Sequence, residues 1–192
     1  VVTLTATDGL TNAANCEATE VIFNGSDGAY KVKATTLEEI ESSETPGIIA
    51  MAFDCDENEL VVVQGKYNAS RIGRSSDGHL GKLSWTPSKH NMDIAKIVDQ
   101  NCYSTDGKKV FVTDLATSET KEIPNVFDEW IKDLLPLNKH QIIIGTKDKN
   151  IYQLNADGTS LNLGQCDDWV DQLIDIPFSN NFISTAHQYT LE

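Results

Sequence analysis

Apolar and polar positions form short runs along the chain that recur about every 40 residues. In each copy an apolar, β-prone run ends in a short polar turn, and a second β-prone run follows. The turn centres are Asp27, Lys66, Asp106, Asp148 and His187, so the successive steps are 39, 40, 42 and 39 residues. A period of roughly 20–50 residues is typical of solenoids and propellers. The pattern therefore predicts an all-β repeat protein.

Each period has room for four strands. In the first copy, residues 19–23 lead into the turn Asp27-Gly28, and residues 30–33 then alternate as a half-buried strand does. Asp-Gly at such a turn meets the backbone demands of a tight hairpin. A single four-stranded sheet cannot bury both of its faces, so neighbouring sheets stack as the blades of a propeller. We therefore expect one blade per repeat.

Two segments near the end of the chain fit a helix as well as a strand, and two helices would make the fold α+β. Their apolar residues are Val126, Phe127, Trp130, Ile131, Leu134 and Leu135 in the first and Trp169, Val170, Leu173 and Ile174 in the second. We predict strands, because both segments are short, run into a proline (Pro136, Pro177) and stand where the repeat needs its innermost strand.

Residues 128–131 and 142–154 resemble a degenerate WD40 repeat. They combine an aromatic opening at Trp130, a small-residue strand end, a turn aspartate (Asp148) and an alternating strand, and residues 23–32 look like the same element. No Gly-His dipeptide opens a repeat, and no Trp-Asp dipeptide closes a third strand. The resemblance implies a β-propeller of about five four-stranded blades, or a fragment of a seven-bladed propeller.

The repeats divide the chain into a single expected propeller domain covering residues 1–192. The repeats span residues 9–46, 47–90, 91–124, 125–164 and 165–192. The last repeat ends soon after its third strand, while residues 2–6 form an alternating strand with no repeat of their own. We expect residues 1–8 to close the last blade.

The charge balance restricts the kinds of partner. The chain has 29 acidic and 15 basic residues, a formal net charge of −14. Such a field repels phosphate backbones and attracts basic surfaces. No apolar run reaches the roughly 18 residues of a membrane-spanning helix. We expect a protein partner of basic character within a multi-protein complex, no direct nucleic-acid binding and no membrane insertion.

Cysteines and glycosylation sequons give different indications of location. Cys16, Cys55, Cys102 and Cys166 are spread about one per repeat without the close spacing of zinc ligands, which favours free thiols in the cytoplasm or nucleus. Two disulfides are the alternative, and the sequence does not choose among their pairings. Sequons at Asn24 and Asn68 favour secretion instead.

Catalytic and metal motifs are weak. Asp54, Asp56 and Asn58 fit the opening of a calcium loop, but Glu59 stands where that loop needs glycine. An ordinary solvated turn explains these residues as well. The histidines are scattered, and no nucleotide-binding glycine cluster or nucleophile motif occurs. We expect neither a cofactor nor catalysis.

The strongest candidate binding residues are two acidic-aromatic segments. They contain Asp128, Glu129 and Trp130 in the fourth repeat and Asp167, Asp168 and Trp169 in the fifth. Tryptophan is enriched at binding hot spots, and nearby carboxylates favour lysine or arginine from a partner. Packing of both indoles in the core between blades is the competing interpretation.

The sequence therefore predicts a propeller that acts as a protein-interaction scaffold, a step that rests on analogy because one fold hosts many functions. A secreted, five-bladed, glycan-binding propeller is the first alternative. A propeller of the glycoside-hydrolase type is the second, with Asp54, Asp128 and Asp168 as candidate carboxylates.

Overall fold

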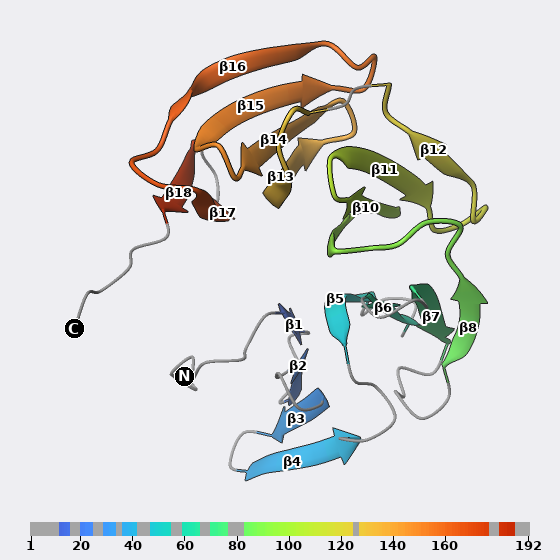
Figure 1. The fold of residues 1–192 in the computed structure, drawn as a ribbon. Coiled ribbons are helices and arrows are strands. Elements are labelled where there is room, and N and C mark those ends of the chain that lie inside the picture. Colours follow the sequence, from blue (N-terminus) through green and yellow to red (C-terminus); the bar gives the residue numbers. More distant parts are fainter. Residues whose placement is uncertain are drawn as a thin grey trace. The chain divides into compact units, whose positions relative to one another are not determined.

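The chain is all-β in a computed structural model, as expected. The structure describes residues 12–15, 20–24, 29–33, 36–41, 47–54, 59–65, 70–76, 83–124, 127–176 and 181–186. Over these residues the strands form four four-stranded sheets and one two-stranded sheet, with every pair of neighbouring strands antiparallel. Within each sheet, strands that are consecutive in the chain lie side by side (Figure 1).

The strand bounds follow the chain sheet by sheet. The first sheet contains β1 (Asn12–Asn15), β2 (Glu20–Asn24), β3 (Ala29–Lys33) and β4 (Thr36–Glu41). The second contains β5 (Ile48–Asp54), β6 (Glu59–Gln64), β7 (Arg71–Ser75) and β8 (Ser84–Pro87). The third contains β9 (Ile94–Val98), β10 (Asn101–Asp106), β11 (Lys109–Asp114) and β12 (Thr120–Glu122). The fourth contains β13 (Ile131–Asn138), β14 (Gln141–Thr146), β15 (Asn150–Asn155) and β16 (Ser160–Gln165), and the last contains β17 (Val170–Asp175) and β18 (Phe182–Ala186).

The chain folds into two compact units, Val1–Met92 and Asp93–Glu192. The first unit contains the sheets β1–β4 and β5–β8, and the second contains β9–β12, β13–β16 and β17–β18. The expectation that residues 1–192 form a single propeller domain of five repeats stays a prediction. Residues 1–8, expected to close the last blade, lie outside the described part of the chain, as do Asp27, Lys66 and His187.

Both segments for which helix and strand competed are strands. β13 begins at Ile131 and β17 begins at Val170, so each strand starts directly after its tryptophan. Short bends at residues 128–129 and 167–168 precede them. The two tryptophans therefore stand in the connections that lead into the strands.

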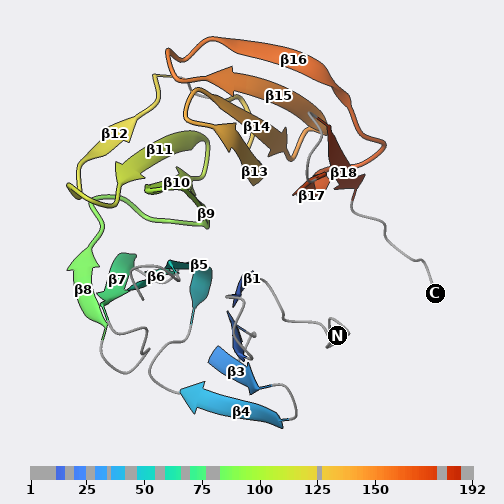
Figure 2. The same cartoon turned by 180° about the vertical axis from the view of Figure 1, so that it is seen from behind.

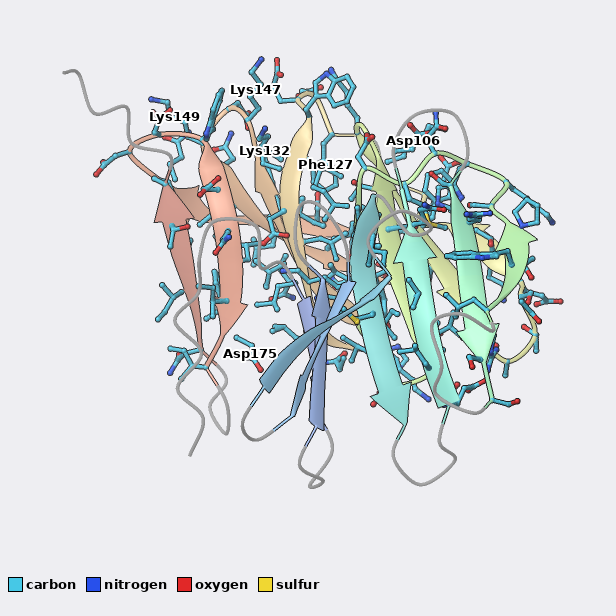
Figure 3. The ribbon with its side chains drawn as sticks, turned by 90° about the horizontal axis from the view of Figure 1, so that it is seen from below. Asp106, Phe127, Lys132, Lys147, Lys149 and Asp175 are labelled. Atoms are coloured by element: carbon cyan, nitrogen blue, oxygen red, sulfur yellow. The ribbon has the colours of Figure 1, made fainter. Side chains whose placement is uncertain are left out.

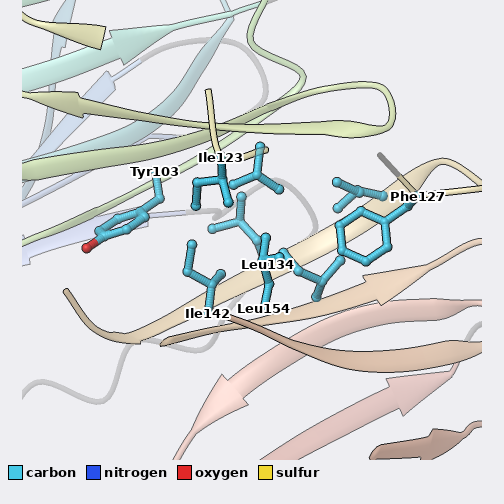
Figure 4. Close-up of a cluster of buried hydrophobic side chains, with 9 residues drawn as sticks. Tyr103, Ile123, Phe127, Leu134, Ile142 and Leu154 are labelled. Carbon is cyan, nitrogen blue, oxygen red and sulfur yellow. The ribbon is translucent and has the colours of Figure 1, made fainter. Parts of the chain in front are cut away.

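The second unit has one apolar core on each side of the β13–β16 sheet. The larger cluster lies between the third and fourth sheets, and Figure 4 shows Tyr103, Phe127 and Leu134 among its nine residues. The smaller cluster joins Leu135 and Ile143 to Val170 and Leu173 of β17. The two faces of the sheet are both buried because successive strand residues point to opposite sides.

Glycine allows close contact between β14 and β17. A Cβ atom added to Gly145 would lie 2.3 Å from Cγ1 of Val170 and 2.6 Å from its Cβ. Any larger residue at this position would push the last sheet away from the fourth. The small residue noted at this strand end in the sequence thus has a packing reason.

A buried carboxylate joins the first strands of the three sheets in the second unit. Asp133 of β13, 7% exposed, accepts hydrogen bonds from the Lys96 ammonium of β9 at 3.0 Å and from the Leu173 N–H of β17 at 2.7 Å. Its other oxygen accepts the N–H of Leu134 at 2.9 Å. Both oxygens are thus satisfied, which offsets the cost of burying the charge.

Candidate functional site

The predicted binding residues gather at one end of the strands of the second unit. Ile131, the first residue of β13, pairs with Thr146, the last residue of β14, so the turn at residues 147–149 lies beside the segment that leads into β13. Figure 3 shows Lys132, Lys147, Lys149, Phe127 and Asp106 toward this end and Asp175 at the opposite end. We call this end, formed by residues 106–108, 127–130, 147–149 and 166–169, the turn face.

Each hairpin turn of the turn face holds the segment that leads into the next sheet. The Lys108 carbonyl accepts the N–H of Phe127 at 3.2 Å, and the Lys108 ammonium donates to the Asp128 carbonyl. Lys149 repeats this arrangement with Cys166 and Asp167, at 2.9 and 2.8 Å. The third and fourth sequence repeats therefore make the same two contacts, one through the lysine carbonyl and one through the lysine ammonium. The sheet β9–β12, which carries Lys108, is seen best in Figure 2.

Trp130 is the exposed aromatic residue of the turn face. Its carbonyl accepts the Lys147 N–H at 2.9 Å, and its ring lies over Gly107, where an added Cβ would meet the ring at 3.5 Å. The residue is 54% exposed. The competing interpretation, that this indole packs in the core between blades, is therefore wrong for Trp130.

Trp169 differs from Trp130 in what its ring contacts. It is half-buried, and the Lys132 ammonium of β13 lies 4.9 Å from its ring centroid, a cation–π contact. Lys132 occupies a register shift of β13 between Ile131 and Asp133. The shift places an extra residue in the strand, as in a β-bulge.

The acidic residues of the turn face have different surroundings. Asp128 and Asp167 are exposed, whereas Glu129 and Asp168 are half-buried, and Asp168 accepts the N–H of its neighbour Trp169 at 2.7 Å. The structure thus brings all six predicted residues to one end of the second unit. Whether they bind a partner stays a prediction.

Asp148 is held in the turn between β14 and β15. Its two carboxylate oxygens accept hydrogen bonds from the Thr146 hydroxyl and the Asn150 amide, the latter at 2.6 Å. The pKa of the nearby Tyr152 hydroxyl is raised by burial and, to a smaller extent, by the charges of Asp148 and Asp128. The two carboxylates therefore contribute to one negative field around Tyr152.

Lys108, Lys132 and Lys149 were not predicted as parts of this site. Lys147-Asp148-Lys149 reads as an ordinary exposed turn, and all three residues are exposed. The available signal was the recurrence of a lysine one residue before the third strand of consecutive repeats, Lys108 before β11 and Lys149 before β15.

The weak metal candidates stay a prediction, because most of them lie outside the described residues. Asp54 ends β5, and Asp56 and Asn58 lie outside the described residues. In the described ranges, no three histidine, cysteine or acidic side chains are placed to hold a metal ion. Cys102 and Cys166 carry free thiols, whereas Cys16 and Cys55 fall outside the described part. No helix within the described residues could span a membrane.

Several solved structures resemble this chain, and one of them is a WD40 β-propeller. The WD40 β-propeller domain of Doa1 superposes with a TM-score of 0.66 at 13% identity, covering 93% of this chain and 62% of that domain. The designed protein Ika8 gives 0.58 at 18% identity, with 90% and 54% coverage. A chain of the nidogen/laminin complex gives 0.55 at 8% identity, with 72% and 56% coverage. This chain thus spans less than two thirds of each of these structures.

No protein-family model matches the sequence. No curated protein matches it either. The structural likenesses, together with the four-stranded antiparallel sheets, define the class of protein as a β-propeller with a likeness to WD40 domains.

Proposed function

We propose that this protein is a non-catalytic β-propeller scaffold that binds a partner protein at the turn face and works within a multi-protein complex. The observation that carries the proposal is the exposed residue Trp130, which the acidic residues Asp128 and Glu129 directly precede in the chain. A large aromatic side chain with 54% of its surface exposed is typical of a binding anchor rather than of core packing.

The partner surface that fits this site is basic. Asp128 and Asp167 are exposed acids on either side of the fourth sheet, and the whole chain carries a formal charge of −14. Opposite charges at the rim of an interface speed association and exclude partners of the wrong sign. The same net charge opposes direct binding of nucleic acids.

We place the protein in the cytoplasm or nucleus. The free thiols of Cys102 and Cys166 support a reducing compartment, where exposed disulfides are rare. The secreted alternative rests on the sequons at Asn24, in β2, and Asn68, which lies outside the described residues.

Affinity capture followed by mass spectrometry tests the scaffold. The full chain is used as bait beside Trp130→Ala, and Leu161→Ala is the matched control because Leu161, 59% exposed on β16, stands away from the turn face. We expect Trp130→Ala to lose a specific protein that the control and the parent chain retain. Capture that is unchanged by Trp130→Ala in a folded chain removes the turn face from the proposal. A defined sugar hit on a glycan array contradicts the scaffold function itself.

A further inference from the structure

The three tryptophans of this chain can be compared directly, because all of them lie in the described residues. In the first unit, the Arg71 guanidinium lies 4.0 Å from the ring centroid of Trp85. In the second, the Lys132 ammonium lies 4.9 Å from that of Trp169. Two indoles are thus covered by a cation from their own chain. Over the described residues, no cation lies on the ring of Trp130, the most exposed of the three.

The local structure explains why the Trp130 ring is left open. Lys132 reaches Trp169 from the register shift in β13. β9, the first strand of the preceding sheet, pairs with β10 without any register shift. Ile94 begins β9 as Ile131 begins β13. The residue after Ile94 is Ala95, which is 3% exposed and carries no charge, whereas the residue after Ile131 is Lys132. The first strand of the third sheet therefore has no cation for Trp130, whereas the first strand of the fourth sheet places Lys132 on Trp169.

One side of the Trp130 ring is already covered. The turn at Gly107 lies against it, so the exposed part of the indole faces away from that turn. More than half of Trp130 is open to solvent at the turn face, and tryptophan is the side chain that attracts cations most strongly through its ring.

Carboxylates lie in the same segment as Trp130 and in the adjoining turn. Asp128 and Glu129 directly precede Trp130, and Asp148 is fixed by Thr146 and Asn150 in the adjoining turn. Two positively charged lysines are also near this segment. The Lys108 ammonium is bound to the Asp128 carbonyl, and Lys147 is exposed and contacts Trp130 through its backbone N–H. Among the described residues, neither ammonium lies over the ring.

We propose that the open face of Trp130 receives an arginine side chain from an exposed segment of the partner protein, with the carboxylates of Asp128 and Glu129 beside it. This inference rests on the proposed function, because it names the chemistry of the partner at that site. A planar guanidinium stacks on an indole and binds a carboxylate at the same time, which an ammonium does less well. The Arg71–Trp85 contact is an example of this stacking within the chain itself.

The test is a titration of the full-length, ¹⁵N-labelled chain followed by NMR. Its three tryptophans give three indole N–H signals. The variants Trp85→Phe, Trp130→Phe and Trp169→Phe assign these signals, since each removes one of them. The probe is the capped tripeptide acetyl-Gly-Arg-Gly-amide. The matched control is the same peptide with citrulline, which keeps the shape of arginine without its charge.

We expect the arginine peptide to shift the Trp130 signal in a saturable way and to leave the Trp85 and Trp169 signals in place. The citrulline peptide should bind more weakly by about two- to fivefold, as an exposed cation–π contact implies. In Asp128→Asn/Glu129→Gln, the arginine peptide should bind more weakly by a similar factor. Equal shifts with both peptides, or a Trp130 signal that does not move, overturn the inference.

The outcome is separable from that of the proposed function. If capture of the partner needs Trp130 but the arginine peptide does not shift its signal, the scaffold stands and the arginine site falls. If the peptide shifts Trp130 but no captured partner depends on that residue, the arginine site stands and the turn face is removed from the proposed function.

Discussion

Lys149 binds the segment leading into β17 through its side chain, because its ammonium donates to the Asp167 carbonyl at 2.8 Å. Its own carbonyl accepts the N–H of Cys166 at 2.9 Å. Lys108 makes the same pair of contacts with Phe127 and Asp128 one sheet earlier. The turn lysines therefore attach the third and fourth sheets to the connections that begin the next ones, and they hold the acidic-aromatic segments in place.

Replacement of Lys149 tests this attachment. The residue has a φ of 76°, a conformation that glycine adopts freely and other residues adopt at a cost. Lys149→Ala loses the ammonium contact and keeps the strained backbone, so we expect the free energy of unfolding to fall by about 1 kcal/mol.

Lys149→Gly loses the same ammonium contact but relieves the backbone. We expect it to be more stable than Lys149→Ala by about 0.5–1 kcal/mol, measured by urea unfolding of both variants. An alanine variant at least as stable as the glycine variant would show that the backbone conformation at this turn has little energetic effect.

Asp133→Asn should strongly destabilise the second unit. The asparagine amide places an N–H₂ group where one carboxylate oxygen now accepts a donor, and the Lys96 ammonium loses its charged partner. We expect a loss of about 3 kcal/mol in the free energy of unfolding. Glu122→Gln is the control, because it breaks the exposed Lys109–Glu122 pair, and it should change the free energy by about 0.5 kcal/mol or less. Equal effects of the two variants would contradict a structural role for the buried carboxylate.

Gly145→Ala should weaken the packing of β14 against β17. The added Cβ would lie 2.3 Å from a methyl carbon of Val170, so the two strands must separate. We expect a loss of about 1–3 kcal/mol, as for other overpacked sites. Thermal unfolding of Gly145→Ala measures the effect, and an unchanged melting temperature would mean that the last sheet moves at no cost. The double variant Gly145→Ala/Val170→Ala should lose less than the sum of the single effects, because the two sites share the contact.

Cys102 should make stability depend on pH in the alkaline range. Burial raises the pKa of its thiol from 9.0 to about 12. The folded state thus favours the protonated thiol, and this contribution to stability is complete below pH 9.0 and is lost as the pH rises toward about 12. We expect the free energy of unfolding to fall by about 2 kcal/mol between about pH 9 and about pH 10.5.

The control for this prediction is Cys102→Ala, which should show a smaller fall over the same range. Part of the fall should remain, because burial also raises the pKa values of Tyr103 and Tyr152. In a chain with Cys16 and Cys55 replaced by serine, a thiol reagent at about pH 8 should label half-buried Cys166 before buried Cys102. Identical pH curves for the parent chain and Cys102→Ala would contradict the assignment.

Much of the hairpin structure could be predicted from sequence. The turns at Asp106 and Asp148 and the strands around them follow from apolar alternation and turn chemistry, which act over a few residues. The strand at β13 was predictable with its partner β14, although helical spacing competed with it. Pairing with β14 satisfies the backbone groups of β13 and buries Leu134 and Leu135 on opposite faces, whereas a helix would place both residues on one face.

The candidate site was predictable only in part. The acidic and aromatic residues were found because their types and their positions before strands recur in the sequence. Lys132 was not found, because a register shift in β13 decides where its side chain goes, and alternation alone does not reveal such a shift. The ion pair of Lys96 and Asp133 was missed for a related reason, since the two residues belong to different sheets.

The sequence by itself determined the period and the hairpin turns at Asp106 and Asp148, since local alternation and turn residues specify them. It favoured the all-β class, and the structure decided against the helices. Only the tertiary structure decided which tryptophan is covered and which is open. Lys132 meets Trp169 because β13 and β17 pack together, while β9 brings no cation to Trp130. Contacts between sheets depend on packing and register that are set by the whole fold, and the open indole of Trp130 is one result of them.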